Sequence, residues 1–161
     1  MIRCSTAAPE QTKRLAAAVA LAVVDGDLLV LVGDLGAGKT AFTQGFAAAL
    51  GVADSVTSPT FTLANRYEGS VVLNHLDAYR VEDLSEAEHL ALPELLDDGV
   101  TVIEWGDNIL GALPSDRLEI RITLGFNDDD RDLELSCLGP TWVARRDALA
   151  VSLSQWGSKS C

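Results

Sequence analysis

Residues 33–40 read GDLGAGKT, and their types and spacing point to phosphate chemistry. The stretch satisfies the phosphate-loop pattern of a glycine, any four residues and then Gly-Lys-Thr. Gly36 and Gly38 permit backbone angles that turn successive N–H groups inward to form an anion-binding nest, and a following helix adds the positive end of its dipole. We expect Lys39 to reach the β- and γ-phosphates of a nucleotide and the Thr40 hydroxyl to ligate Mg²⁺.

The predicted nucleotide-binding residues extend over the whole loop and into the helix that follows it. They are Gly33, Asp34, Leu35, Gly36, Ala37, Gly38, Lys39, Thr40 and Ala41. Ala41 stands where a second hydroxyl residue commonly helps to hold the α-phosphate, so its backbone N–H must do that work alone. A glycine-rich turn that binds nothing is the alternative interpretation of the pattern. The apolar run before the loop and the alanine-rich run after it predict a strand and a helix, and this context favours nucleotide binding.

Two acidic residues end apolar segments that we interpret as strands: Asp77 in VVLNHLDAYR and Glu104 in VTVIEW. Either carboxylate could hold Mg²⁺ from a second strand, directly or through water. One isolated acid at an exposed strand end would mean little, but two such strands beside a phosphate loop favour chemistry. His75 and His89 are more typical of surface or packed residues than of ligands.

The sequence favours ATP over GTP, because neither an Asn-Lys-x-Asp guanine motif nor an Asp-x-x-Gly switch occurs in it. A P-loop kinase for a small metabolite is one alternative function, and a nucleotide-responsive binding module with negligible catalysis is another. A kinase would ordinarily need a lid with several arginines. Arg145 and Arg146 form the only adjacent arginine pair, and the surface of a helix explains that pair more simply than a lid does.

The loop and the acids need a scaffold, and 161 residues that are 48% hydrophobic suffice for one domain spanning residues 1–161. The pattern predicts helices starting at 9–10, over 40–50, over 83–99 with an interruption at Pro93, and over 141–156. It predicts strands over 27–32, within 56–69 at a sheet edge, up to 77, over 100–104, and in an antiparallel hairpin over 116–138. This order predicts an α/β fold, a P-loop NTPase-like three-layer sandwich whose mostly parallel central sheet has antiparallel additions.

The formal charge of −12 argues against a broad basic surface for nucleic acid, so any RNA would be held mainly by a partner. Cys4, Cys137 and Cys161 lack metal-ligand spacing and are interpreted as free thiols in a reducing cytoplasm. The apolar run 15–24 follows two basic residues, as in a signal peptide, but it is far shorter than the ~20 residues that span a bilayer. We therefore expect a core-packed first helix and no membrane association.

Four blocks of the sequence occur together in one protein family. GDLGAGKT at 33–40, VTSPTFTL at 56–63, HLDAYR at 75–80 and IEW at 103–105 follow in this order. Their order and approximate spacing resemble the bacterial TsaE family, formerly called YjeE. The likeness extends from the first predicted helix through the hairpin.

The resemblance implies an ATPase of tRNA threonylcarbamoyladenosine synthesis, the modification of adenosine 37 in tRNAs that read codons starting with A. In that family the protein does not transfer the threonylcarbamoyl group. It acts on the TsaD–TsaB complex, which performs the transfer from threonylcarbamoyl-adenylate, and its ATP hydrolysis supports repeated turnover. Contact with tRNA would then fall mainly to the partners, in the cytoplasm.

The resemblance also implies roles for single residues. Lys39 and the loop amides resemble the family's phosphate contacts, and Thr40 with Glu104 resembles its Mg²⁺ ligands. Thr60 lies in a segment that resembles a switch, where a hydroxyl could sense the γ-phosphate. Asp77 matches the family's important aspartate, and we predict that it is catalytic, orienting the attacking water or a switch.

Two further positions bear on the nucleotide. Trp105 matches the tryptophan beside the family's metal-binding glutamate, which would place it next to the nucleotide. Ala41 departs from the common Gly-Lys-Thr-Thr sequence, and this departure bears on nucleotide affinity.

Overall fold

The computed structural model describes residues 1–59, 64–78, 92–104 and 106–158. Its strands are β1 (Ile2–Thr6), β2 (Leu28–Val32), β3 (Ala64–Tyr67), β4 (Leu73–Asp77), β5 (Val100–Glu104), β6 (Arg117–Leu124) and β7 (Arg131–Leu138). Its helices are α1 (Pro9–Ala20), α2 (Lys39–Ala49), α4 (Leu92–Leu96) and α5 (Pro140–Ser152), with 3₁₀ turns η1 (Gly106–Ala112) and η2 (Ser154–Trp156).

The described strands form one sheet in the order β1-β7-β6-β2-β5-β4-β3. Its centre is parallel, because β2 pairs in parallel with both β5 and β6, and β5 pairs in parallel with β4. Antiparallel strands flank this centre, with β7 and β1 on one side and β3 at the opposite edge. The predicted parallel centre with antiparallel additions is therefore confirmed, in a sheet that is mixed as a whole.

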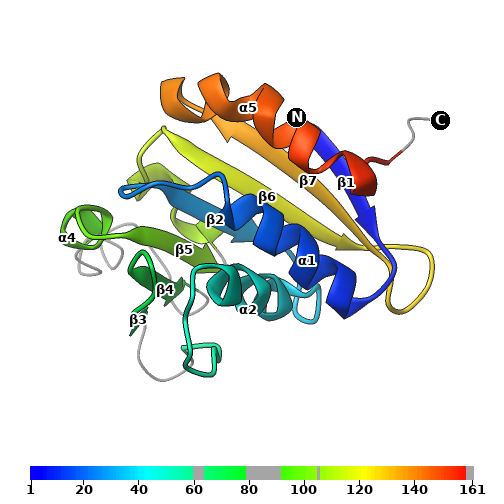
Figure 1. Cartoon of the computed structure of the whole chain (residues 1–161), viewed down its shortest axis with the longest axis horizontal. Coiled ribbons are helices and arrows are strands. Elements are labelled where there is room, and N and C mark those ends of the chain that lie inside the picture. The colour runs from blue at the N-terminus through cyan, green and yellow to red at the C-terminus, as the bar shows by residue number, and fades with distance from the viewer. Residues whose placement is uncertain (60–63, 79–91, 105, 159–161) are drawn as a thin grey trace.

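Strand β2 shows why the molecule has three layers. All five of its residues are buried, and alternate side chains enter two separate cores. Leu29 and Leu31 join the core beneath α1, α2 and α5, whereas Leu28 and Val30 join the smaller core beneath α4 and η1. Figure 1 shows α1 and α2 lying side by side over the sheet.

Helix α1 confirms the predicted core-packed first helix. It begins at Pro9, a residue suited to a first turn, and buries Leu15 and Val19. Across from it, a Cβ at Gly45 of α2 would collide with the carbonyl oxygen of Lys13, so glycine allows the two helix backbones to approach closely. Within the described part of the chain, no helix has the length and apolar character that crossing a membrane requires.

Helix α5 is tied to the sheet by a charged side chain. Arg145 Nη1 and Nη2 donate to the two carboxylate oxygens of Asp27 at 2.7 and 2.8 Å, and the guanidinium lies 4.0 Å above the Trp142 ring. These hydrogen bonds raise the pKa of Arg145 above its usual range. Arg146 is exposed. Both arginines lie on a helix, as predicted, but Arg145 turns inward and joins two elements.

Some details differ from the sequence predictions. Strand β1 was not predicted, and its edge position is made by pairing with β7, more than a hundred residues later. Pro93 lies in α4, and the residues just before α4, which the predicted interruption at Pro93 also concerns, lie outside the described residues. Most of the helix predicted over 83–99 lies outside the described residues. Cys4 and Cys137 are free, as predicted, and Cys161 lies outside the described residues.

Candidate nucleotide site at the phosphate loop

The carboxyl ends of three parallel strands bring the predicted site together. The loop 33–38 leaves the end of β2, Glu104 is the last residue of β5, and Asp77 is the last residue of β4. Glu104 pairs with Leu31 on one side and with Asp77 on the other, so the two acids lie opposite each other on neighbouring strands. Ligands of open parallel sheets bind at this edge.

The loop backbone has the shape that the glycine pattern predicts. Gly36 and Gly38 have φ angles of 82° and 105°, which glycine adopts without the strain that a side chain would bring. Gly38 is the N-cap of α2, and no side chain caps that helix end. Gly33 is needed for another reason, because a Cβ there would lie 2.5 Å from the carbonyl oxygen of Ile122 on β6.

Lys39 places its ammonium group within the loop. Lys39 as a whole residue is only 6% exposed. The Nζ atom donates to the carbonyl oxygens of Gly33 and Asp34, at 2.5 and 2.9 Å. The positive charge therefore lies where the loop turns and α2 begins, beside the N-terminal end of the helix.

Glu104 lies under helix α2, close to two buried neighbours. Its side chain is 3% exposed, and its Oε1 lies 3.2 Å from His75 Nε2. The single hydroxyl proton of Thr43 has two acceptors within reach, the carbonyl oxygen of Lys39 at 3.0 Å and the same Glu104 oxygen at 3.5 Å. Thr43 thus connects the carboxylate to the first turn of α2. Of the surface and packed positions that the sequence left open for His75, the structure shows the packed one, since the residue is fully buried.

Asp77 is more open than Glu104 and has a different neighbour. Its side chain is half-buried, and Oδ2 accepts a hydrogen bond from Ser58 Oγ at 3.1 Å. Ser58 belongs to the VTSPTFTL block, so this contact brings two of the four sequence blocks together at the sheet edge. Thr60 of the same block, Trp105 and His89 lie outside the described residues.

The remaining loop positions surround this centre. Asp34, Leu35 and Gly36 are exposed, Ala37 is buried, and Thr40 and Ala41 are half-buried in the first turn of α2. The residues therefore fit a phosphate group, since left-handed glycines, an uncapped helix end and a lysine meet at one place. The described residues contain no cluster of three or more His, Cys, Asp or Glu side chains suited to a metal. Mg²⁺ bound through a nucleotide needs fewer protein ligands than such a cluster provides.

Sequence reasoning missed three side chains at this edge: Thr43, Ser58 and Arg131. Thr43 follows Lys39 by four residues and so shares its helix face, which is a signal that the sequence did contain. Ser58 lies in the VTSPTFTL block, which does point to this segment although not to the serine itself, whereas no local pattern points to Arg131. Arg131, at the start of β7, donates from Nε to the carbonyl of Ala37 at 2.8 Å.

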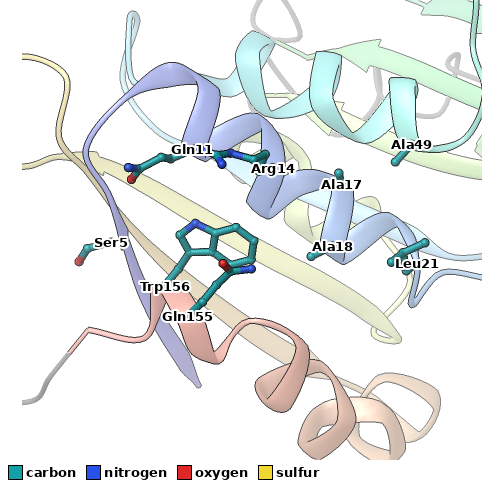
Figure 2. A pocket seen from close by; sticks show the side chains of 9 residues that line it. All are labelled: Ser5, Gln11, Arg14, Ala17, Ala18, Leu21, Ala49, Gln155 and Trp156. Atoms are coloured by element: carbon teal, nitrogen blue, oxygen red, sulfur yellow. The ribbon is translucent and has the colours of Figure 1, made fainter.

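A separate groove lies between β1, α1 and η2 (Figure 2), with a volume of about 750 Å³. Figure 2 shows the ring of Trp156 facing α1, where Gln11 and Arg14 project, while Ala17 and Ala18 continue the wall. None of the phosphate-loop residues lines this groove. It is distinct from the edge that gathers Lys39 and the two acids.

The sheet order, the glycine loop and the helix that starts from it define a P-loop NTPase-like α/β protein. The family model described as "Threonylcarbamoyl adenosine biosynthesis protein TsaE" matches residues 6–133. The chain therefore belongs to the TsaE family.

The chain is also similar to individual known proteins of this family. The tRNA threonylcarbamoyladenosine biosynthesis protein TsaE of Bacillus subtilis is 44% identical over 140 residues, covering 86% of this chain and 87% of that protein. The protein of the same name from Treponema pallidum is 35% identical over 136 residues, covering 84% of this chain and 100% of that protein. The crystal structure of Bacillus subtilis YdiB superposes with a TM-score of 0.79 at 36% identity, covering 96% of this chain and 97% of that one.

Proposed function

We propose that this chain is the ATP-binding and ATP-hydrolysing component of tRNA N6-threonylcarbamoyladenosine synthesis, acting on a TsaD–TsaB complex to support its turnover. One observation carries the ATPase part of the proposal. The phosphate loop, Glu104 and Asp77 lie at the same edge of the parallel sheet, with Glu104 linked to α2 through Thr43. The names of the relatives support the pathway.

The residues of the loop bind and orient the phosphates in this proposal. MgATP, when bound, supplies the phosphoanhydride bond that water cleaves to give ADP and inorganic phosphate. Lys39 and the amides of the loop neutralise and position the β- and γ-phosphates. Thr40 and Glu104 would hold Mg²⁺, Thr40 from the helix and Glu104 from the neighbouring strand. Thr60 and Trp105 stay predicted nucleotide contacts from their sequence positions.

Asp77 acts on water in this scheme rather than on the metal. Its exposed fraction is larger than that of Glu104, and one of its oxygens is already engaged by Ser58. A half-buried carboxylate in that position can accept a proton from, or orient, a water molecule near the loop. The two acids therefore divide the work between metal binding and hydrolysis.

The charge of the molecule fits a dependence on partners. With a net charge of −12, this chain lacks the excess of cations that tRNA binding requires, so we assign tRNA contact mainly to TsaD and TsaB. We place the protein in the cytoplasm with those partners and assign it no membrane role. Slow hydrolysis by the chain alone follows if the partners complete the transition-state site.

Calorimetric titration with MgADP tests the binding step. Wild type should bind, and Lys39→Ala should lose most of the affinity while its circular dichroism stays unchanged. Lys13→Ala removes the same charge from α1 and serves as the matched control, with wild-type affinity expected. Equal MgADP affinity of Lys39→Ala and wild type would overturn the assignment of the loop. In a reaction with ATP, a phosphorylated metabolite in place of inorganic phosphate would favour a kinase.

A further inference from the structure

Arg131 connects the phosphate loop to a hairpin that is distant in the sequence. It is the first residue of β7, directly after the acidic turn 125–130. Its Nε donates to the carbonyl oxygen of Ala37 at 2.8 Å, and its Nη2 donates to that of Gly36 at 3.3 Å. A Cβ added to Gly38 would lie 3.8 Å from the same Nε. The guanidinium thus lies against the second half of the loop.

The other side of the guanidinium holds the hairpin turn. Its Nη1 donates to the carbonyl oxygens of Asp128 and Asp130, at 2.6 and 2.7 Å. A guanidinium has five N–H donors in a rigid planar fork. Arg131 directs its hydrogen bonds to main-chain carbonyls of two segments. This arrangement suits a clamp between the segments better than a finger that reaches a phosphate.

The clamp has a geometric consequence for the next amide. A trans peptide is planar, so its C=O and N–H point in opposite directions. No cis peptide bond occurs in the described chain. When Arg131 fixes the Ala37 carbonyl on the hairpin side, the N–H of Gly38 must point to the other side. Gly38 has a φ angle of 105° and is the N-cap of α2, so this amide belongs to the predicted anion-binding nest.

We propose that Arg131 is a positioning residue that fixes the Ala37–Gly38 peptide, so that the Gly38 N–H is preorganised for a nucleotide phosphate. The inference rests on the proposed nucleotide binding at the loop and adds the element that holds the loop in shape. The conformational cost of ordering a glycine-rich loop is then met on folding, before the ligand arrives.

The test combines two readouts on three variants. Arg131→Gln removes the charge, Arg131→Lys keeps the charge but not the planar fork, and Arg146→Gln removes an exposed charge from α5 as the control. We expect both Arg131 variants to bind MgADP about tenfold more weakly, the factor that corresponds to about 1.4 kcal/mol. Arg146→Gln should bind MgADP within about twofold of wild type, because Arg146 is exposed on α5. A factor of two corresponds to about 0.4 kcal/mol.

The second readout needs no nucleotide. Backbone ¹⁵N order parameters of residues 36–38 should be about 0.85 in wild type, as for rigid backbone, and should fall below about 0.6 in both Arg131 variants. Wild-type order parameters in these variants would overturn the proposal, as would full rescue of both readouts by lysine. Failure of the wild-type protein to bind MgADP would refute nucleotide binding instead, while the order parameters still decide whether Arg131 fixes the loop. Circular dichroism checks folding, and Arg131→Lys carries the test if Arg131→Gln unfolds.

Discussion

At the scale of single residues, the two strand-end acids differ in their surroundings. Glu104 is buried and contacts His75 and Thr43, whereas Asp77 is half-buried and accepts a hydrogen bond from Ser58. A carboxylate fixed beneath the first turn of α2 suits a metal ligand, and a more open one suits a group that orients water. The difference in burial therefore fits the division of roles that we propose for the two acids.

Replacing each acid by alanine should separate these roles. Glu104→Ala should weaken Mg²⁺-dependent nucleotide binding by about tenfold or more and reduce hydrolysis with it. Asp77→Ala should leave MgATP affinity nearly unchanged while lowering phosphate release by about a hundredfold or more. Calorimetry with MgATP and phosphate release with partners present measure the two effects. Loss of Mg²⁺-dependent affinity in Asp77→Ala, with retention in Glu104→Ala, would require the roles to be exchanged.

At the scale of elements, local patterns predicted much of the fold. The run 27–32 is short, mostly apolar and bounded by Gly26 and Gly33, and it contains the fully buried β2. The alternating segments around the acidic turn form the β6–β7 hairpin. Strand β1 could not be predicted in the same way, because its place depends on pairing with β7 from the far end of the chain. Likewise, the glycine pattern indicates the loop, but the Arg131 contact depends on tertiary structure.

The crossing of α1 and α2 gives an element-scale prediction. Gly45→Ala should destabilise the protein by about 1 to 3 kcal/mol, because the added methyl group meets the backbone of Lys13 and forces the two helices apart. Ala48→Ser, at an exposed position of the same helix, should change the stability by no more than about 0.5 kcal/mol. Urea unfolding followed by circular dichroism measures both. A Gly45→Ala protein as stable as wild type would show that the helices can separate without cost.

At the scale of the whole molecule, the buried Cys4 thiol makes the free energy of unfolding vary with pH in the alkaline range. Burial raises the pKa of Cys4 from 9.0 to about 11. As the pH rises, the Cys4 thiol therefore loses its proton in the unfolded state before it does so in the folded state. The stabilisation of the folded state by the neutral thiol is present below pH 9 and is lost as the pH rises through 11. The difference between these two pKa values corresponds to a loss of about 2 to 3 kcal/mol of unfolding free energy over that range.

The comparison with Cys4→Ala isolates this contribution. The alanine protein should be less stable than wild type near pH 7, because it leaves a small cavity beside β7. The difference in unfolding free energy between the two proteins should shrink between pH 9 and 11, since only wild type carries the Cys4 thiol. Urea unfolding at several pH values measures it. A difference that stays constant over this range would contradict a raised pKa.

Phosphate release from ATP tests the central claim most directly, measured with the chain alone, with TsaD–TsaB, and with TsaD–TsaB and tRNA. We predict slow release by the chain alone, faster release with the partners, and loss of both in Lys39→Ala, whose ammonium lies within the loop. Lys13→Ala should behave as wild type. No phosphate release under any of these conditions, or release by Lys39→Ala at the wild-type rate, would contradict the assignment of this site as an ATPase.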